Sequence, residues 1–145
     1  MYQLYKKGRV NLSINSCLVN RAQPKCGEIW LCRLESYNGS IQRGYRPVYI
    51  LSNNENNTYS NTLNVIPLTS RMNKRNLPVH VELWDYHKYG LKSPSTLMVE
   101  QIMTITSNSL DRKIGTIADS DTMNRIRYAI SVQFPVMAAC QSIAI

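Results

Sequence analysis

Two segments decide the fold: Arg46-Pro47-Val48-Tyr49-Ile50-Leu51-Ser52 and Thr62-Leu63-Asn64-Val65-Ile66-Pro67-Leu68-Thr69-Ser70. Both are rich in β-branched and other apolar residues, and each follows a polar loop. Pro47 has no backbone N–H, so it fits the first residue of a strand beside a loop. Its ring also keeps Arg46 out of the α region. Arg46 is therefore a cation on an extended, stiff backbone facing a polar loop, which is a place to hold an anion.

Other segments also carry strand patterns. Residues 28–34 are apolar on both alternating faces, which predicts a strand buried on both sides. Residues 78–84 alternate, with Val79, Val81 and Leu83 on the apolar face. Shorter strands are expected at 96–99 and 101–105, and a helical turn at 107–110. The tract 52–61 contains five asparagines and is predicted to be a surface loop.

One helix is predicted, near residues 120–134. Asp119, Ser120 or Asp121 would cap it, and Pro135 would end or kink it. Its apolar stripe has helical spacing and consists of Met123, Ile126, Ile130 and Phe134. Short strands followed by a terminal helix predict a mainly β fold, a small and strongly curved β-barrel with the helix lying against it.

The length of 145 residues suits one domain with a real core. We expect residues 1–25 to be an N-terminal extension, partly disordered, and residues 26–145 to form the barrel domain with its helix. The formal net charge is +8. This excess favours a polyanionic partner, either nucleic acid or an acidic protein, although a solvated basic surface without a specific partner would give the same count.

Neither a membrane segment nor a secretory signal is expected. No run approaches the ~18 apolar residues of a membrane helix, and no apolar region follows the basic N-terminus. The four cysteines show no CxxC pair and no regular framework: Cys17, Cys26, Cys32 and Cys140. We therefore expect a reduced, cytoplasmic chain without a disulfide or metal site.

Five motifs in order resemble the MazF/PemK family of toxin endoribonucleases. They extend over roughly residues 27–134 and are Gly27-Glu28-Ile29-Trp30, Gly39-Ser40-Ile41-Gln42 with Arg46-Pro47-Val48, Pro67-Leu68-Thr69-Ser70, Leu77-Pro78-Val79-His80-Val81-Glu82-Leu83, and Glu100-Gln101-Ile102-Met103-Thr104-Ile105. The resemblance implies an SH3-like barrel with a C-terminal helix. It also implies a ribosome-independent, sequence-specific cut of single-stranded mRNA that needs no metal or other cofactor and leaves a 2′,3′-cyclic phosphate and a 5′-hydroxyl. A homodimer and a cognate acidic antitoxin are the implied partners.

The family pattern places its catalytic arginine on Arg46 and its catalytic threonine on Thr69. A guanidinium can bind two phosphate oxygens at once, and a threonine hydroxyl can donate to the same phosphate. His80 is the alternative proton carrier by chemistry, and His87 a weaker one. The remaining candidates would contact or approach RNA: Ser40, Gln42 and Gln101 through base edges or backbone, Tyr37 and Tyr45 by stacking, and Arg43, Arg71, Lys74 and Arg75 through phosphates.

Two departures from the family pattern keep other functions open. Ile41 stands where the family usually has a glutamate, and Met103 where it often has an arginine. A relative that binds RNA or antitoxin without cutting is one alternative. A CcdB-like toxin acting on a protein such as gyrase is a second, and a generic barrel-type RNA-binding module is a third.

Overall fold

The computed structural model describes residues 23–35, 44–72 and 76–137. The strands are β1 (Glu28–Leu34), β2 (Gly44–Ile50), β3 (Thr62–Thr69), β4 (His80–Leu83), β5 (Ser95–Met98), β6 (Met103–Thr106) and β7 (Leu110–Thr116). The helices are α1 (Asn54–Tyr59) and α2 (Ser120–Gln133), with short 3-10 turns η2 (Tyr86–Tyr89), η3 (Val99–Gln101) and η4 (Ser107–Ser109). The predicted turn at 107–110 corresponds to η4. The extension 1–25 and the domain boundary at 26 remain predictions, since residues 1–22 lie outside these ranges.

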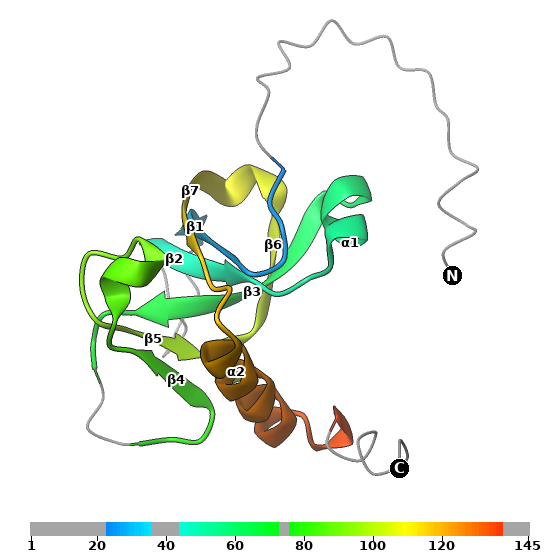
Figure 1. The fold of residues 1–145 in the computed structure, drawn as a ribbon. Coiled ribbons are helices and arrows are strands. Elements are labelled where there is room, and N and C mark those ends of the chain that lie inside the picture. The colour runs from blue at the N-terminus through cyan, green and yellow to red at the C-terminus, as the bar shows by residue number, and fades with distance from the viewer. Residues whose placement is uncertain (1–22, 36–43, 73–75, 138–145) are drawn as a thin grey trace, which may run out of the picture.

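All strand pairs in the described ranges are antiparallel, and together they form one sheet. The order is β4-β5-β3-β2-β1-β7, and β6 also pairs with β3. β3 thus lies at the centre, with β2 on one side and with β5 and β6 along its length on the other. Figure 1 shows α2 lying across the sheet near β4 and β5. The predicted fold class, a mainly β barrel-like fold with a C-terminal helix, is confirmed.

Two hydrophobic clusters explain why residues 28–34 are apolar on both faces. Ile29 of β1 belongs to the cluster that Ile126 and Ala129 of α2 complete. Trp30 and Cys32 point to the opposite face and belong to the second cluster. Because successive strand residues face opposite sides, a strand between two cores has no solvent face to fill with polar residues. The predicted two-sided burial of this strand is confirmed.

Helix α2 begins and ends where the sequence predicts. Asp119 is the N-cap, and its carboxylate accepts the backbone N–H of Thr122 at 3.0 Å. The helix ends at Gln133 with Phe134 as C-cap, directly before Pro135, whose ring cannot continue the hydrogen-bonded pattern. The described residues contain no helix long and apolar enough to cross a membrane.

The prediction of a surface loop at 52–61 is wrong in part, because α1 lies within it. Asn53 caps this helix, and its Oδ1 accepts the N–H of Asn56 at 2.8 Å. Asn57 is buried and donates to the carbonyl of Ser52 at 2.9 Å. Asparagine has a low helix propensity. Here its side chains make up for this by capping the helix and forming tertiary hydrogen bonds. A smaller difference is that β2 begins at Gly44, before the expected start at Arg46.

Candidate active site

Strands β2 and β3 bring Arg46 and Thr69 together on one face of the sheet. Val48 pairs with Pro67 across these strands. If this register is continued by two residues, Arg46 lies opposite Thr69. Side chains alternate along a strand, so Arg46 and Thr69 point to the same face of the sheet as Val48. Arg46 is half-buried and Thr69 is buried. The two residues expected to act on a phosphate thus lie on one face, just beyond Val48–Pro67, the last pair of the β2–β3 pairing.

The row of polar side chains continues beyond Thr69. Thr69 pairs with Thr96 on β5, and Thr96 pairs with Glu82 on β4. At ~4.8 Å between neighbouring strands, the row from Arg46 to Glu82 extends for roughly 14 Å. We call these four residues (Arg46, Thr69, Thr96 and Glu82) the polar row. Sequence reasoning did not identify Thr96. The only hint in the sequence was that Glu82 lies on the polar face of a strand whose residues alternate between apolar and polar.

The hydroxyl of Thr69 keeps its hydrogen available for a substrate. Its Oγ1 accepts the backbone N–H of Arg71 at 3.2 Å. A threonine hydroxyl has one donor and two acceptor positions, and no acceptor for the Thr69 hydrogen occurs among the residues the structure describes. The bond from Arg71 therefore fixes the oxygen, while the hydrogen has no acceptor within the described ranges. Arg71 itself is exposed just beyond the end of β3.

The other sequence candidates lie around the polar row. His80 of β4 lies two residues before Glu82, so their side chains point to the same face of the sheet. His80 is paired with Met98. Its Nε2 is 2.8 Å from Oε1 of Glu100, and its side chain is only 8% exposed. Gln101, on η3, donates from Nε2 to the sulfur of Met98 at 3.7 Å. The structure therefore brings His80 and Gln101 to the same sheet face as Arg46, separated from it by intervening strands.

Several predicted RNA-binding residues lie outside the described residues. They are Tyr37, Ser40, Gln42 and Arg43, between β1 and β2 in the sequence, and Lys74 and Arg75, between β3 and β4. Their roles remain predictions. His87 belongs to η2, where its ring lies 3.9 Å from that of Tyr86, centre to centre.

The described cysteines are poor nucleophiles. Burial raises the pKa of the Cys32 thiol to about 12 and also raises the pKa of Cys26. Both are free thiols, and both stay protonated near neutral pH. The described ranges also contain no group of three or more His, Cys, Asp or Glu side chains able to hold a metal ion. The donors gathered near Arg46 are instead a guanidinium and hydroxyls.

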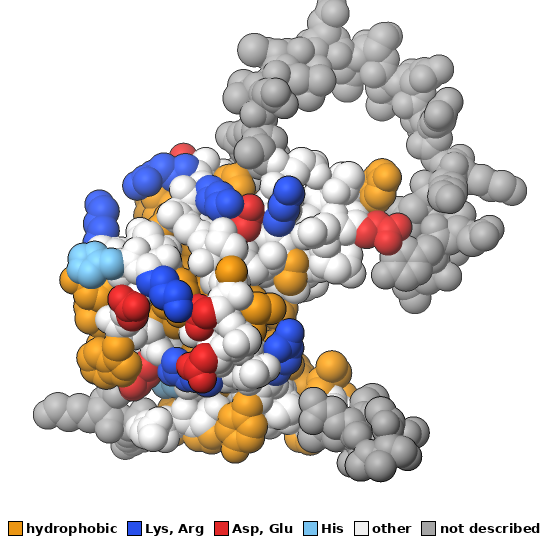
Figure 2. All heavy atoms as spheres, in the orientation of Figure 1, with side chains coloured by type: hydrophobic (Ala, Val, Ile, Leu, Met, Phe, Trp, Pro, Cys, Tyr) orange, Lys and Arg blue, Asp and Glu red, His pale blue; other side chains and the backbone are white. Residues whose placement is uncertain are grey.

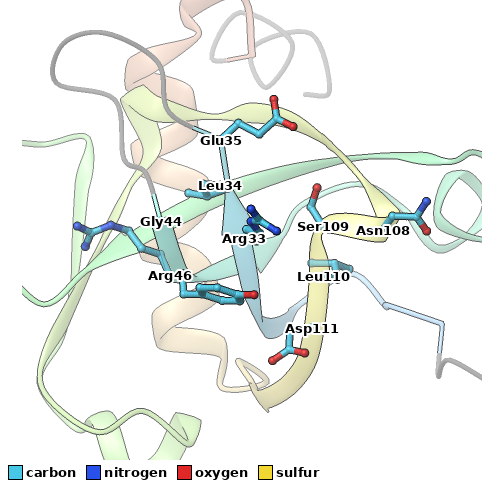
Figure 3. Close-up of a pocket in the computed structure, with 10 residues that line it drawn as sticks. Arg33, Leu34, Glu35, Gly44, Arg46, Asn108, Ser109, Leu110 and Asp111 are labelled. Atoms are coloured by element: carbon cyan, nitrogen blue, oxygen red, sulfur yellow. The ribbon is translucent and has the colours of Figure 1, made fainter.

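An open groove of about 1090 Å³ adjoins Arg46 (Figure 3). It lies where the end of β1 and the start of β2 meet η4 and the start of β7. Its lining residues are Arg33, Leu34, Glu35, Gly44, Tyr45, Arg46, Asn108, Ser109, Leu110 and Asp111.

Comparisons with known proteins agree with this arrangement. A model of the family described as "PemK-like, MazF-like toxin of type II toxin-antitoxin system" matches residues 25–134. Endoribonuclease MazF of Staphylococcus saprophyticus is 38% identical over 106 residues, which are 73% of this chain and 87% of that protein.

Solved structures support the fold alone, because their sequence identities are low. The Mycobacterium tuberculosis toxin MazF-mt6 aligns with a TM-score of 0.62 at 24% identity, over 74% of this chain and 96% of that one. MazF in a MazE–MazF crystal structure from Deinococcus radiodurans aligns with a TM-score of 0.62 at 20% identity, over 79% and 97%. The family model and the curated relative each cover most of the chain, and together they settle its membership: this protein belongs to the PemK-like, MazF-like toxin family of type II toxin–antitoxin systems.

Proposed function

We propose that this toxin is an endoribonuclease that cuts single-stranded mRNA at a specific sequence. The 2′-hydroxyl attacks the neighbouring phosphorus, the 5′-oxygen leaves, and the products carry a 2′,3′-cyclic phosphate and a 5′-hydroxyl. The observation that carries the proposal is the cross-strand placement of Arg46 and Thr69 in a chain of this family. The S. saprophyticus relative is itself named an endoribonuclease.

Arg46 would stabilise the charge that grows on the phosphoryl oxygens. A guanidinium binds two oxygens in one plane, and its charge persists at every physiological pH. Thr69 would donate its hydroxyl hydrogen to the same phosphate from a position fixed by Arg71 N–H. Donors placed in advance where charge develops are each worth a few kcal/mol in the transition state. The 2′-hydroxyl is supplied by the RNA itself, and the family resemblance supports a reaction without metal.

The proton carrier is a separate question. Arg46 is a poor candidate because guanidinium hardly deprotonates in proteins. His80 has the right chemistry, but Glu100 engages its Nε2, and a general base must reach the proton that it removes. Replacing His80 by Gln tests the assignment, since a proton carrier would alter the dependence of the cleavage rate on pH, whereas a residue that only supports Glu100 would leave that profile in place.

We further propose a homodimer that is neutralised in the cytoplasm by an acidic antitoxin. The net charge of +8 suits both RNA and an acidic partner. Exposed apolar side chains at the end of α2 support a protein interface there: Val132, Phe134, Val136 and Met137. Phe134 and Met137 also line a second groove, of about 480 Å³, with Ile102 and Ile130. The D. radiodurans MazF was crystallised with MazE.

The decisive experiment is incubation of the purified protein with long single-stranded RNA in EDTA, followed by mapping of the ends. The comparison proteins are Arg46→Ala, Thr69→Val and, as a matched control, Arg112→Ala, which removes an exposed arginine of β7 outside the polar row. We expect discrete cuts with cyclic-phosphate ends from the wild type and the control, no cuts from Arg46→Ala, and cuts slowed about 100-fold in Thr69→Val.

Ile41 keeps a non-cleaving relative as the second candidate, because the family usually has a glutamate at that position. RNA binding without cleavage by the folded wild type, over varied sequences, would favour it. Intact RNA without RNA binding would instead favour a CcdB-like action on a protein target.

A further inference from the structure

The groove beside Arg46 is lined by residues from both faces of the sheet, including Arg46 on the face of the polar row and Tyr45 on the opposite face. Tyr45 and Arg46 are consecutive residues of β2, so their side chains point to opposite faces. In Figure 3 the Arg46 side chain points away from Arg33, which extends from β1 toward Ser109 and Asn108. The two surfaces therefore share Arg46, whereas Tyr45 and Arg33 belong to the groove and not to the polar row.

Tyr45 and Arg33 form the floor of this groove. They are direct partners in the β1–β2 pairing, which puts both on one face. The Tyr45 side chain is 63% exposed, a large apolar ring left in solvent. The Arg33 side chain is also exposed, and within the described ranges it makes no ion pair and no hydrogen bond. An exposed ring beside an exposed guanidinium is a combination that can stack on an unpaired base and donate hydrogen bonds to it.

The charge of the groove favours a base over a phosphate. Arg33 and Arg46 are matched there by two carboxylates, Glu35 and Asp111. Carboxylates repel phosphate but accept hydrogen bonds from the amino groups of bases. Asn108 adds an amide that both donates and accepts. The lining thus offers hydrogen-bond donors and acceptors around the flat ring of Tyr45, with no net excess of positive charge.

We propose that this groove binds one unpaired nucleobase adjacent to the phosphate that is cut, with Tyr45 stacking on the base and Arg33 donating to its acceptor edge. The inference rests on the proposed function. Consecutive residues of one strand would then hold consecutive parts of the RNA, since Arg46 binds the phosphate and Tyr45 binds the neighbouring base. Sequence preference at that nucleotide would come from this groove.

The test uses an RNA oligonucleotide that contains one mapped cut site, with a 2′-deoxynucleotide at the cut so that it binds without reacting. Abasic residues are placed in turn at each nucleotide flanking the cut. Dissociation constants are measured for the wild type, Tyr45→Ala and Arg33→Ala. Tyr128→Ala is the control for ring loss, because Tyr128 is 64% exposed on α2. Arg112→Ala is the control for charge loss.

We expect one abasic position to weaken binding by the wild type about tenfold, the size of one stacked base. Tyr45→Ala should weaken binding of the intact RNA by a similar factor and lose no further affinity at that abasic position. Arg33→Ala should reduce the preference among the four bases at the same nucleotide. Both controls should behave as the wild type, and thermal unfolding of each variant confirms that it is folded.

The outcomes separate the two proposals. If the wild type cuts RNA but Tyr45→Ala and Arg33→Ala bind every oligonucleotide as their controls do, the base site is wrong and the nuclease stands. The base site is equally overturned if Tyr45→Ala and the abasic position weaken binding independently, because the ring and the base then do not touch. If the wild type neither cuts nor binds RNA, the proposed function fails and the base site fails with it.

Discussion

At the scale of single residues, the hydroxyl of Thr69 carries the most specific chemistry. The residue is buried to 7% exposure at the end of β3, and one backbone N–H fixes its oxygen. A buried threonine in a strand is often there for its shape. Shape and hydroxyl are separable by substitution, because valine keeps the branched outline and serine keeps the oxygen.

Thr69→Val should lower the cleavage rate by about 100-fold, the cost of removing one aligned donor. Thr69→Ser should retain activity within about tenfold of the wild type, since it keeps the donor. The rates are measured on an RNA with one mapped site. Thr104→Val serves as the control, because Thr104 is an exposed threonine of β6 that bonds Asn64. Equal losses in the serine and valine variants would show that the methyl group, not the hydroxyl, is required.

At Gly115 the backbone packs closely against the backbone of Tyr89. A Cβ at this position would lie 2.1 Å from the carbonyl oxygen of Tyr89. Gly115→Ala should therefore cost about 3 kcal/mol of unfolding free energy, the upper range for overpacking. Gly44 is the contrasting case, because its φ is +79° but a Cβ there meets nothing within 4 Å. Gly44→Ala should cost about 1 kcal/mol from backbone strain alone. Urea unfolding measures both, and a larger loss at Gly44 would contradict the packing argument.

At the scale of elements, the start of α2 is held by one carboxylate. The hydrogen bonds of Thr122, assisted by those of Tyr89 and Lys88, hold the pKa of Asp119 well below its usual range. Tyr89 Oη donates to Asp119 at 2.8 Å, and the Lys88 ammonium lies 3.4 Å away. The Asp119 carboxylate therefore links α2 to η2, and the fold is fully stable only when this carboxylate is ionised.

A depressed folded-state pKa gives this charge a defined dependence on pH. The stabilisation is complete above the unfolded value, near pH 4, and is lost as pH falls toward the lower folded value. Asp119→Asn keeps a good cap but removes the charge. We expect the variant to be less stable than the wild type at pH 6, and the difference to shrink steadily below pH 4 in urea unfolding.

The elements also show where sequence reasoning works and where it stops. The two-sided apolar pattern of β1 and the capped stripe of α2 are local signals, so both elements could be predicted. Helix α1 could not, because it depends on tertiary hydrogen bonds such as that of Asn57 with Ser52. Arg46 and Thr69 were identified through family resemblance. Their alignment with Thr96 and Glu82 depends on registers between strands distant in sequence, which no local pattern encodes.

At the scale of the whole molecule, the basic excess is unevenly distributed along the chain. The described ranges contain ten Lys and Arg and all nine Asp and Glu. Figure 2 accordingly shows basic and acidic side chains interspersed over the face in view. The other basic residues lie outside those ranges, with no acid among them: Lys6, Lys7, Arg9, Arg21, Arg43, Lys74 and Arg75. The polyanion affinity implied by the net charge must therefore draw on these segments.

The salt dependence of RNA binding measures that contribution. The double variant Lys74→Gln/Arg75→Gln should reduce the slope of log affinity against log salt by up to about 1.4, because each phosphate of a single strand that is no longer neutralised lowers it by about 0.7. Arg127→Gln, which changes an α2 arginine bonded to Asn124, should leave the slope unchanged. Filter binding at several salt concentrations provides the data, and equal slopes for both variants would exclude a role for the pair.

On the proposed function, the order of strands in the polar row determines when the site can form during synthesis. Arg46 emerges from the ribosome early, but Thr69 and Thr96 must follow before β3 can lie between β2 and β5. The first core cluster is completed only by Ile126 and Ala129. A nascent chain therefore holds its arginine without a working site through most of its synthesis. A chain that stops before α2 is therefore expected to be inactive on RNA, although it already contains Arg46 and Thr69.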